Sequence, residues 1–218
     1  ANGDYHHVEQ NLLPPSYRSY SAAYWDKRVL APSCLLYYLG IDKRLRNLLH
    51  HNLFFHTSMQ QHFHEIYEAP QWPNQPLFYV SCTSQTDPAV APAGCENLFI
   101  LIPIAPGLRD TPEIRAHYLQ TTLHALEQLT EQTIRDHIVY QKSYAYQDFV
   151  QDYHAFNGNA YGLASTLFQT AIFRPSLQSK KVRNLYYTGQ FTVPGPGVPP
   201  AIISGQVVAR EVIKRLGQ

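Results

Sequence analysis

Charged residues are scarce in this chain. Asp, Glu, Lys and Arg make up 15% of its 218 residues, whereas an average soluble domain has about 25%. The formal net charge is +1 and the sequence has no basic stripe, so we predict no nucleic-acid partner. Aromatic residues are abundant instead, at 13%. This composition suits an apolar ligand surface or a large buried interface, but an ordinary aromatic core explains it equally simply.

Long hydrophobic runs are also missing. No uninterrupted apolar stretch approaches the ~20 residues that a membrane-spanning helix needs. Residues 1–10 are polar, so we expect no signal peptide there. The three cysteines, Cys34, Cys82 and Cys95, are an odd number without metal-site spacing, which indicates a reducing compartment. We therefore expect a cytoplasmic protein.

Several catalytic patterns are absent from the sequence. No Gly-rich phosphate-binding loop lies near its start, and no Gly-x-Ser-x-Gly nucleophile elbow is present. Ser204 falls inside a helical pattern, so we interpret it as a packing residue. The 11 histidines do not have the spacing of a zinc site, and we predict no metal. We assign no general base, so the catalytic residue is unknown.

The hydrophobic pattern predicts a mixed α/β chain. Successive strands of a partly antiparallel sheet are expected at 34–39, 52–56, 77–82 and 97–102, the last buried on both faces. A helix is expected after Thr111, which suits the N-cap, with Pro112 in the first turn. Further expected elements are a helical turn at 62–68, a strand at 137–140, a helix at 146–154, a strand at 182–188 and a helix at 201–216.

The most distinctive segment joins the last expected strand to the last helix. Gly189 and Gly197 permit close approach of a ligand to the backbone. Pro199 suits the first helical turn, and Gly197 and Val198 keep their N–H groups available. A helix N-terminus favours a phosphate or an electron-rich ring carbonyl. On the residues alone, such a binding role and a simple connecting turn remain equally supported.

Several segments together resemble the C-terminal part of the phytoene desaturase-type carotenoid dehydrogenases, which belong to the FAD-dependent amine-oxidase-like superfamily. The order and spacing match along nearly the whole chain. The segments that carry the resemblance are residues 1–4, 84–95, 156–163, 173–175, 184–189, 194–199 and 204–205.

The resemblance implies a division into two domains and a cofactor. Residues 1–12 and 182–218 would form part of a split, Rossmann-like FAD-binding domain, and residues 13–181 an α+β substrate-binding domain. Gly189 and Gln190 map to positions near the ribityl–pyrophosphate part of FAD. Gly197 and Val198, followed by Pro199, map to positions near the flavin ring. Gln190 itself departs from the small or acidic residue common in the family after that glycine.

The implied reaction is the removal of two hydrogens from a long polyene such as phytoene, with peripheral membrane contact. Tyr161 and Arg174 are candidate residues on the substrate or flavin side, although ordinary packing explains each as well. The alternatives are a carotenoid cis–trans isomerase, a saturase or a non-catalytic domain that binds an apolar ligand. Because the phosphate loop is missing, we expect this chain to be an inactive piece of the enzyme that binds FAD weakly. The exposed half-domain is expected to favour self-association.

Overall fold

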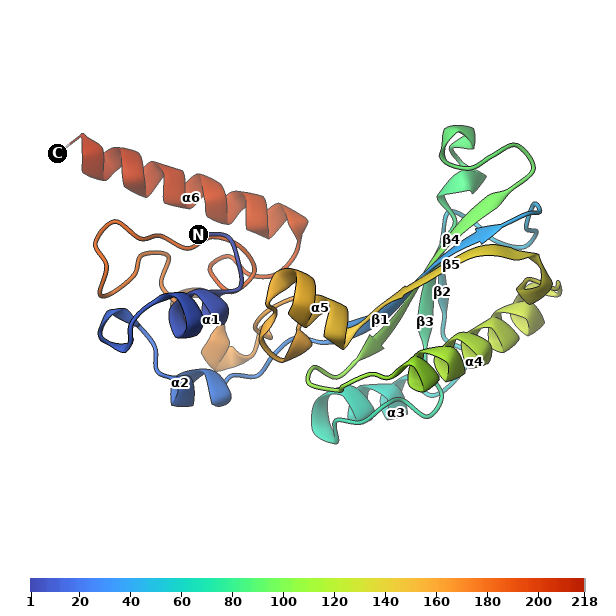
Figure 1. Cartoon of the computed structure of the whole chain (residues 1–218), viewed down its shortest axis with the longest axis horizontal. Helices are drawn as coiled ribbons and strands as arrows, with labels where there is room; N and C mark the ends of the chain where they lie inside the picture. The colour runs from blue at the N-terminus through green and yellow to red at the C-terminus, as the bar shows by residue number, and fades with distance from the viewer. Residues whose placement is uncertain (218) are drawn as a thin grey trace. The chain divides into compact units, whose positions relative to one another are not determined.

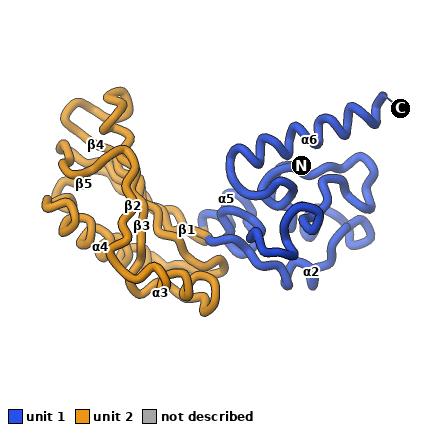
Figure 2. Tube along the Cα trace, turned by 180° about the vertical axis from the view of Figure 1, so that it is seen from behind, with its two compact units in different colours: residues 1–32, 148–218 blue, residues 33–147 orange. Residues whose placement is uncertain are grey.

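The computed structural model describes residues 1–217, which form two compact units (Figure 2). Residues Ala1–Pro32 and Asp148–Gln218 make unit 1, and residues Ser33–Gln147 make unit 2. Residues 1–12 and 182–217, which the resemblance assigns to an FAD-binding domain, both lie in unit 1. However, residues 13–32 and 148–181 also belong to that unit instead of joining the sheet.

Unit 2 is built on a five-stranded sheet in the order β2-β3-β4-β1-β5 (Figure 1). Every pairing is antiparallel, which confirms the mixed α/β class. The strand order places β1 and β4 at the centre of the sheet. The strands are β1 (Ser33–Ile41), β2 (His51–Phe54), β3 (Phe78–Ser81), β4 (Glu96–Ile104) and β5 (Ile138–Tyr144).

One face of this sheet is covered by helix α4 (Pro112–Thr130) (Figure 1). Leu119, Leu123 and Leu126 of α4 are buried in one cluster with the inward side chains of β1 and β4. The helix begins as predicted, because the side chain of Thr111 accepts a hydrogen bond from the N–H of Ile114. Shorter helical segments complete unit 2: α3 (Met59–Phe63), a π-helical turn at His64–Glu68, and 3₁₀ turns at Thr83–Gln85, Pro88–Val90 and Arg135–His137.

The prediction that residues 97–102 are buried on both faces is wrong. Along β4, buried and half-buried residues alternate from Glu96 to Ile104. Leu98 and Ile100 enter the core, while Phe99 and Leu101 point to the other face of the sheet. The apolar run misled the prediction because the second face is itself rich in apolar side chains.

Unit 1 combines several short helices and the long helix α6 with a small, largely aromatic core. The core side chains are Tyr5, Trp25, Leu30, Leu163, Tyr187 and Phe191. The helices are α1 (Tyr5–His7), a π-helical turn (Val8–Leu12), α2 (Ala22–Asp26), α5 (Tyr146–Tyr153), whose first two residues fall in unit 2, and α6 (Val198–Leu216). Four 3₁₀ turns lie at Pro15–Tyr17, Phe156–Gly158, Leu167–Gln169 and Ala171–Phe173.

The expected strand at 182–188 does not form. Its β-bridge partner among the described residues is Gln178, which pairs with Tyr186. The segment also contacts the start of the chain: the amino group of Ala1 donates to the carbonyl of Tyr186 at 2.8 Å, and the N–H of Thr188 donates to the carbonyl of Ala1 at 2.9 Å. A strand needs a continuous ladder, and these isolated bonds do not make one.

Membrane-spanning helices and metal-binding clusters were sought in the part of the chain that the structure describes. Its helices include none with the length and apolar character needed to cross a bilayer. Its His, Cys, Asp and Glu side chains form no cluster of three or more that could hold a metal ion.

Candidate functional site

The segment between residue 188 and helix α6 is a tight turn that depends on glycine. Gly189, Gly195 and Gly197 have φ angles of 102°, 135° and 113°, which L-residues with a side chain rarely adopt. Pro199 and Pro200 then occupy the first turn of α6, where a backbone N–H is not needed for the helix. The turn and the helix start therefore follow directly from the Gly and Pro positions read from the sequence.

A cavity of about 510 Å³ in unit 1 opens at this turn. Four of the five predicted cofactor-binding residues line it: Gly189, Gln190, Gly197 and Val198. Tyr161, the candidate on the substrate side, lines it as well. Pro199 and Arg174 are not part of its lining, although Pro199 adjoins Val198 in the helix start.

The start of α6 presents backbone donors at this cavity. Within residues 1–217, the N–H groups of Gly197 and Val198 meet no hydrogen-bond acceptor. A side chain added at Gly189 would meet no atom closer than the carbonyl oxygen of Asn2, at 3.9 Å. The turn thus leaves both space and unused donors, which together with the helix N-terminus suit an electron-rich ligand group.

Ser204 has a more specific role than the packing residue we expected. Its side chain is fully buried, and its Oγ accepts the N–H of Gly189 at 2.7 Å while donating to the carbonyl of Ala201 at 2.7 Å. The N–H of Gly189 is therefore already used inside the protein. The hydroxyl ties the start of the turn to the first turn of α6, which a helical pattern in the sequence does not reveal.

Two residues that the sequence analysis missed complete one wall of the cavity. Asp4 accepts hydrogen bonds from the N–H of Phe156 at 3.0 Å and from Nδ2 of Asn159 at 3.2 Å. The Oδ1 of Asn159 in turn accepts from Nε2 of Gln190 at 3.1 Å. This chain of contacts fixes the side chain of Gln190. No single motif marks these residues, because Asp4 and Asn159 are 155 positions apart.

Histidine side chains lie in the same unit near Asp4. The ring of His6 stacks on Phe156 with centroids 3.9 Å apart. Burial lowers the pKa of His6 from its ordinary value, and the nearby carboxylate of Asp4 partly opposes this shift. Burial of His6 therefore disfavours its charged imidazolium form.

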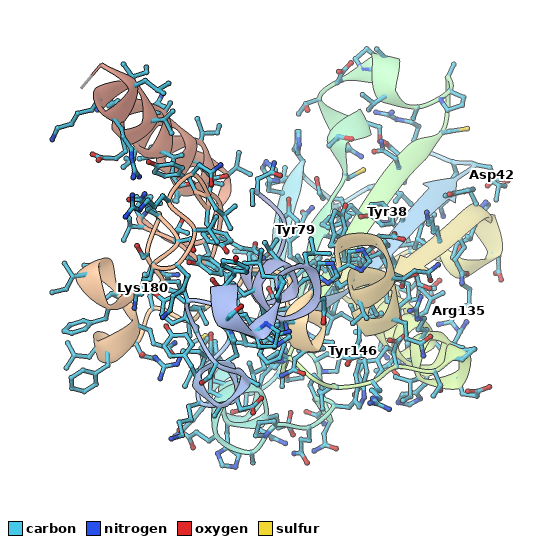
Figure 3. All side chains as sticks on the ribbon, turned by 60° about the vertical axis from the view of Figure 1, so that its left-hand side comes forward. Tyr38, Asp42, Tyr79, Arg135, Tyr146 and Lys180 are labelled. Atoms are coloured by element: carbon cyan, nitrogen blue, oxygen red, sulfur yellow. The ribbon has the colours of Figure 1, made fainter. Side chains whose placement is uncertain are left out.

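The face of the sheet in unit 2 opposite α4 carries several apolar side chains. The register places Tyr38 opposite Phe99 and places Tyr79 opposite Leu101, and directly paired residues share one face. The rings of Tyr38 and Phe99 lie 5.3 Å apart, and those of Tyr79 and Phe99 lie 6.3 Å apart. Tyr38 and Tyr79 are labelled in Figure 3. We call Tyr38, Tyr79, Phe99 and Leu101 the aromatic face.

The aromatic face continues into a second cavity, of about 430 Å³, within unit 2. Tyr38 and Phe99 contribute to its lining together with Tyr140, which is 56% exposed. Gly40 also lines it, and a Cβ there would lie 3.1 Å from the Cβ of Tyr140. Val90 in the 3₁₀ turn of the 83–95 loop, 44% exposed, lines it from outside the sheet. The cavity is therefore a predominantly hydrophobic recess.

Comparison with known proteins finds relatives along nearly the whole chain. The carotenoid 3,4-desaturase of Haloarcula japonica is 46% identical over 213 residues, which cover 98% of this chain and 43% of that protein. The 4,4'-diapophytoene desaturase of Staphylococcus haemolyticus is 30% identical, covering 97% of this chain and 44% of its own length. The zeta-carotene-forming phytoene desaturase of Myxococcus xanthus is 29% identical, covering 97% and 41%. No protein-family model matches the chain.

A solved structure shares the fold. An oxidoreductase from Methanosarcina mazei aligns with a TM-score of 0.52 and 14% sequence identity, covering 96% of this chain and 42% of that chain. The relatives define an oxidoreductase class that acts on carotenoids. Within that class, the chain belongs to the phytoene desaturase-type carotenoid dehydrogenases, which confirms the resemblance found in the sequence. It spans less than half the length of these relatives.

Proposed function

We propose that this chain is the C-terminal part of a flavin-dependent oxidoreductase that desaturates a long apolar polyene in carotenoid biosynthesis. The single observation that supports this most strongly is the 46% identity to a carotenoid 3,4-desaturase over 98% of the chain. In this proposal unit 1 contributes to the FAD site and unit 2 contributes to the substrate site.

The cavity at the start of α6 fits one side of a flavin site. Its glycines leave room for a flat ring against the backbone, and the N–H of Val198 is unpaired within the described residues. A bound flavin would supply the hydride acceptor. The chain's own contribution is to place donors of the helix N-terminus where negative charge develops. The sequence contains no Gly-rich phosphate-binding loop, so we expect the isolated chain to bind FAD weakly.

The aromatic face of unit 2 fits the proposed substrate class. A polyene offers no hydrogen-bonding groups, so apolar area and ring contacts must supply its affinity. Tyr38, Tyr79 and Phe99 provide such a surface, and the adjoining cavity of about 430 Å³ extends it. We infer that the polyene lies against this face. Its low solubility in water also leads us to propose peripheral membrane contact for the complete enzyme.

The proposal is tested with the full-length enzyme. We expect the purified protein to carry flavin absorbance, to lose it anaerobically when a carotenoid is added, and to form a product lighter by two hydrogens. A product that gains oxygen would instead indicate oxygenation, and a product of unchanged mass would indicate isomerisation. A protein without flavin and without any polyene product would refute the proposal.

A pair of variants tests the role of the aromatic face in binding the substrate. Tyr38→Glu places a charge on the aromatic face, where desolvating it opposes polyene binding, so we expect kcat/KM to fall about tenfold or more. Gln120→Glu adds the same charge at an exposed position of α4 and is expected to leave kcat/KM within about twofold of wild type. Equal effects of the two variants would argue against a role of this face in binding the substrate. Flavin absorbance should be unchanged in both.

A further inference from the structure

Arg174 is a buried cation without an acidic partner. Its side chain is 5% exposed, and no carboxylate among residues 1–217 forms an ion pair with it. Burial accordingly lowers the pKa of its guanidinium from the ordinary value. Placing a charge in such surroundings costs free energy unless the protein supplies compensating hydrogen bonds.

The guanidinium joins two loops of unit 1. Its Nη1 donates to the carbonyl of Gln190 at 3.1 Å, and its Nη2 donates to the carbonyl of Leu163 at 3.1 Å and to Oγ of Ser165 at 3.3 Å. Its Nε is buried without a partner. The planar guanidinium group thus donates hydrogen bonds to both loops at once. A lysine ammonium cannot do this with the same geometry.

Glycines in the two loops leave room for this guanidinium group and for the close approach of the loops. A Cβ on Gly195 would lie 3.1 to 3.4 Å from three guanidinium atoms of Arg174. A Cβ on Gly162 would lie 2.9 Å from Cγ of Gln190. Both glycines have positive φ angles. The 162–165 loop and the 189–197 turn therefore approach closely: a Cβ at position 162 would clash with Gln190, and a Cβ at position 195 would pack very tightly against Arg174.

We propose that Arg174 is the positioning residue of the 189–197 turn. By holding the carbonyl of Gln190 and packing on Gly195, it keeps the Gln190 side chain and the start of α6 in place at the cavity. This differs from the direct contact with substrate or flavin considered from the sequence, because Arg174 does not line that cavity. The importance of the residue for catalysis rests on the proposed function, whereas its positioning role does not.

Hydrogen exchange of this chain tests the positioning role without any cofactor. Arg174→Lys keeps a positive charge but loses the guanidinium that bonds to both loops. We therefore expect the amides of Gly189 and Thr192 to exchange about tenfold faster than in the wild-type chain. Arg18→Lys is the matched control, since Arg18 makes three similar bonds to Gln10 and Leu13. It should leave the two turn amides at the wild-type rate. Unchanged exchange in Arg174→Lys, or equal acceleration in the control, would overturn the proposal.

The full-length enzyme tests the consequence for the reaction. We expect Arg174→Lys to lower kcat about tenfold while KM for the carotenoid changes little, because the turn orients cofactor-side groups and does not bind the polyene. Wild-type kcat in a variant with a loosened turn would refute the catalytic consequence. If the wild-type enzyme binds no flavin, the proposed function fails but the exchange result still stands.

A milder variant covers the case in which Arg174→Lys does not fold. Ser165→Ala removes only one acceptor of the guanidinium and leaves the carbonyls of Gln190 and Leu163 in place. We expect a rise of about threefold in the exchange of the same two amides. The absence of any rise in Ser165→Ala, with the charge and the other two bonds retained, would count against the proposed coupling between the loops.

Discussion

At the scale of single residues, the candidate site depends on side chains whose partners are distant in the sequence. Asp4 bonds to Asn159, which bonds to Gln190, and Arg174 bonds to Gln190 from the other side. Gln190 is therefore held by both its side chain and its carbonyl. These hydrogen bonds fix the position of Gln190 within unit 1.

Replacing Ser204 tests how much a single buried hydroxyl contributes to stability. Ser204→Ala leaves the N–H of Gly189 without its acceptor, so we expect the free energy of unfolding to fall by about 1–3 kcal/mol. Urea unfolding of the chain measures this change. Ser16→Ala is the control, because Ser16 is exposed, and it should shift stability by less than about 0.5 kcal/mol. A negligible effect of Ser204→Ala would show that water replaces the lost hydroxyl.

At the scale of elements, sequence patterns identify helices better than isolated strands. Thr111 and Pro112 define the start of α4 because capping depends on neighbours in the chain. In contrast, residues 182–188 have strand-like composition but, among residues 1–217, form a single β-bridge, to Gln178, and no ladder. Strand formation depends on distant segments, so local sequence cannot decide it. The same dependence explains why the half-exposed face of β4 was not foreseen.

The end of α4 gives a prediction at this scale. Glu131 terminates the helix with φ 55° and ψ 44°, a left-handed conformation that disfavours a residue with a Cβ. We expect Glu131→Gly to stabilise the chain by about 0.5–1 kcal/mol, measured by urea unfolding. Glu131→Ala retains the Cβ and should bring no such gain. Equal stability of the glycine and alanine variants would mean that the backbone conformation at this position is unimportant.

At the scale of the whole molecule, the cavity and the aromatic face occur on separate units. Their chemical characters differ accordingly: unit 1 offers backbone donors at a helix start, and unit 2 offers apolar area. The sequence predicted the mixed fold, and four of the five residues that it nominated for a cofactor site line the first cavity, because Gly and Pro act locally. It could not assign residues 13–32 and 148–181 to unit 1, because that placement results from contacts between distant segments.

Helix α6 carries apolar side chains that the described residues do not cover. Val198, Ile202, Ile213 and Leu216 are between 60% and 83% exposed. The relatives are more than twice as long as their aligned region, and in a full-length enzyme of the proposed kind the additional chain would be available to cover this helix. In the isolated chain, burial of these side chains against a second copy is the remaining way to remove them from water.

We therefore predict that the isolated chain self-associates through α6. Its apparent mass in light scattering should exceed the 24.9 kDa of the monomer and rise with concentration. Replacing both Ile202 and Ile213 by Lys removes apolar area and adds like charges across a self-complementary contact, so the association constant should fall about tenfold or more. Gln206→Lys adds charge to the same helix without removing an apolar side chain and should have a smaller effect. A concentration-independent monomer in the wild-type chain would disprove this prediction.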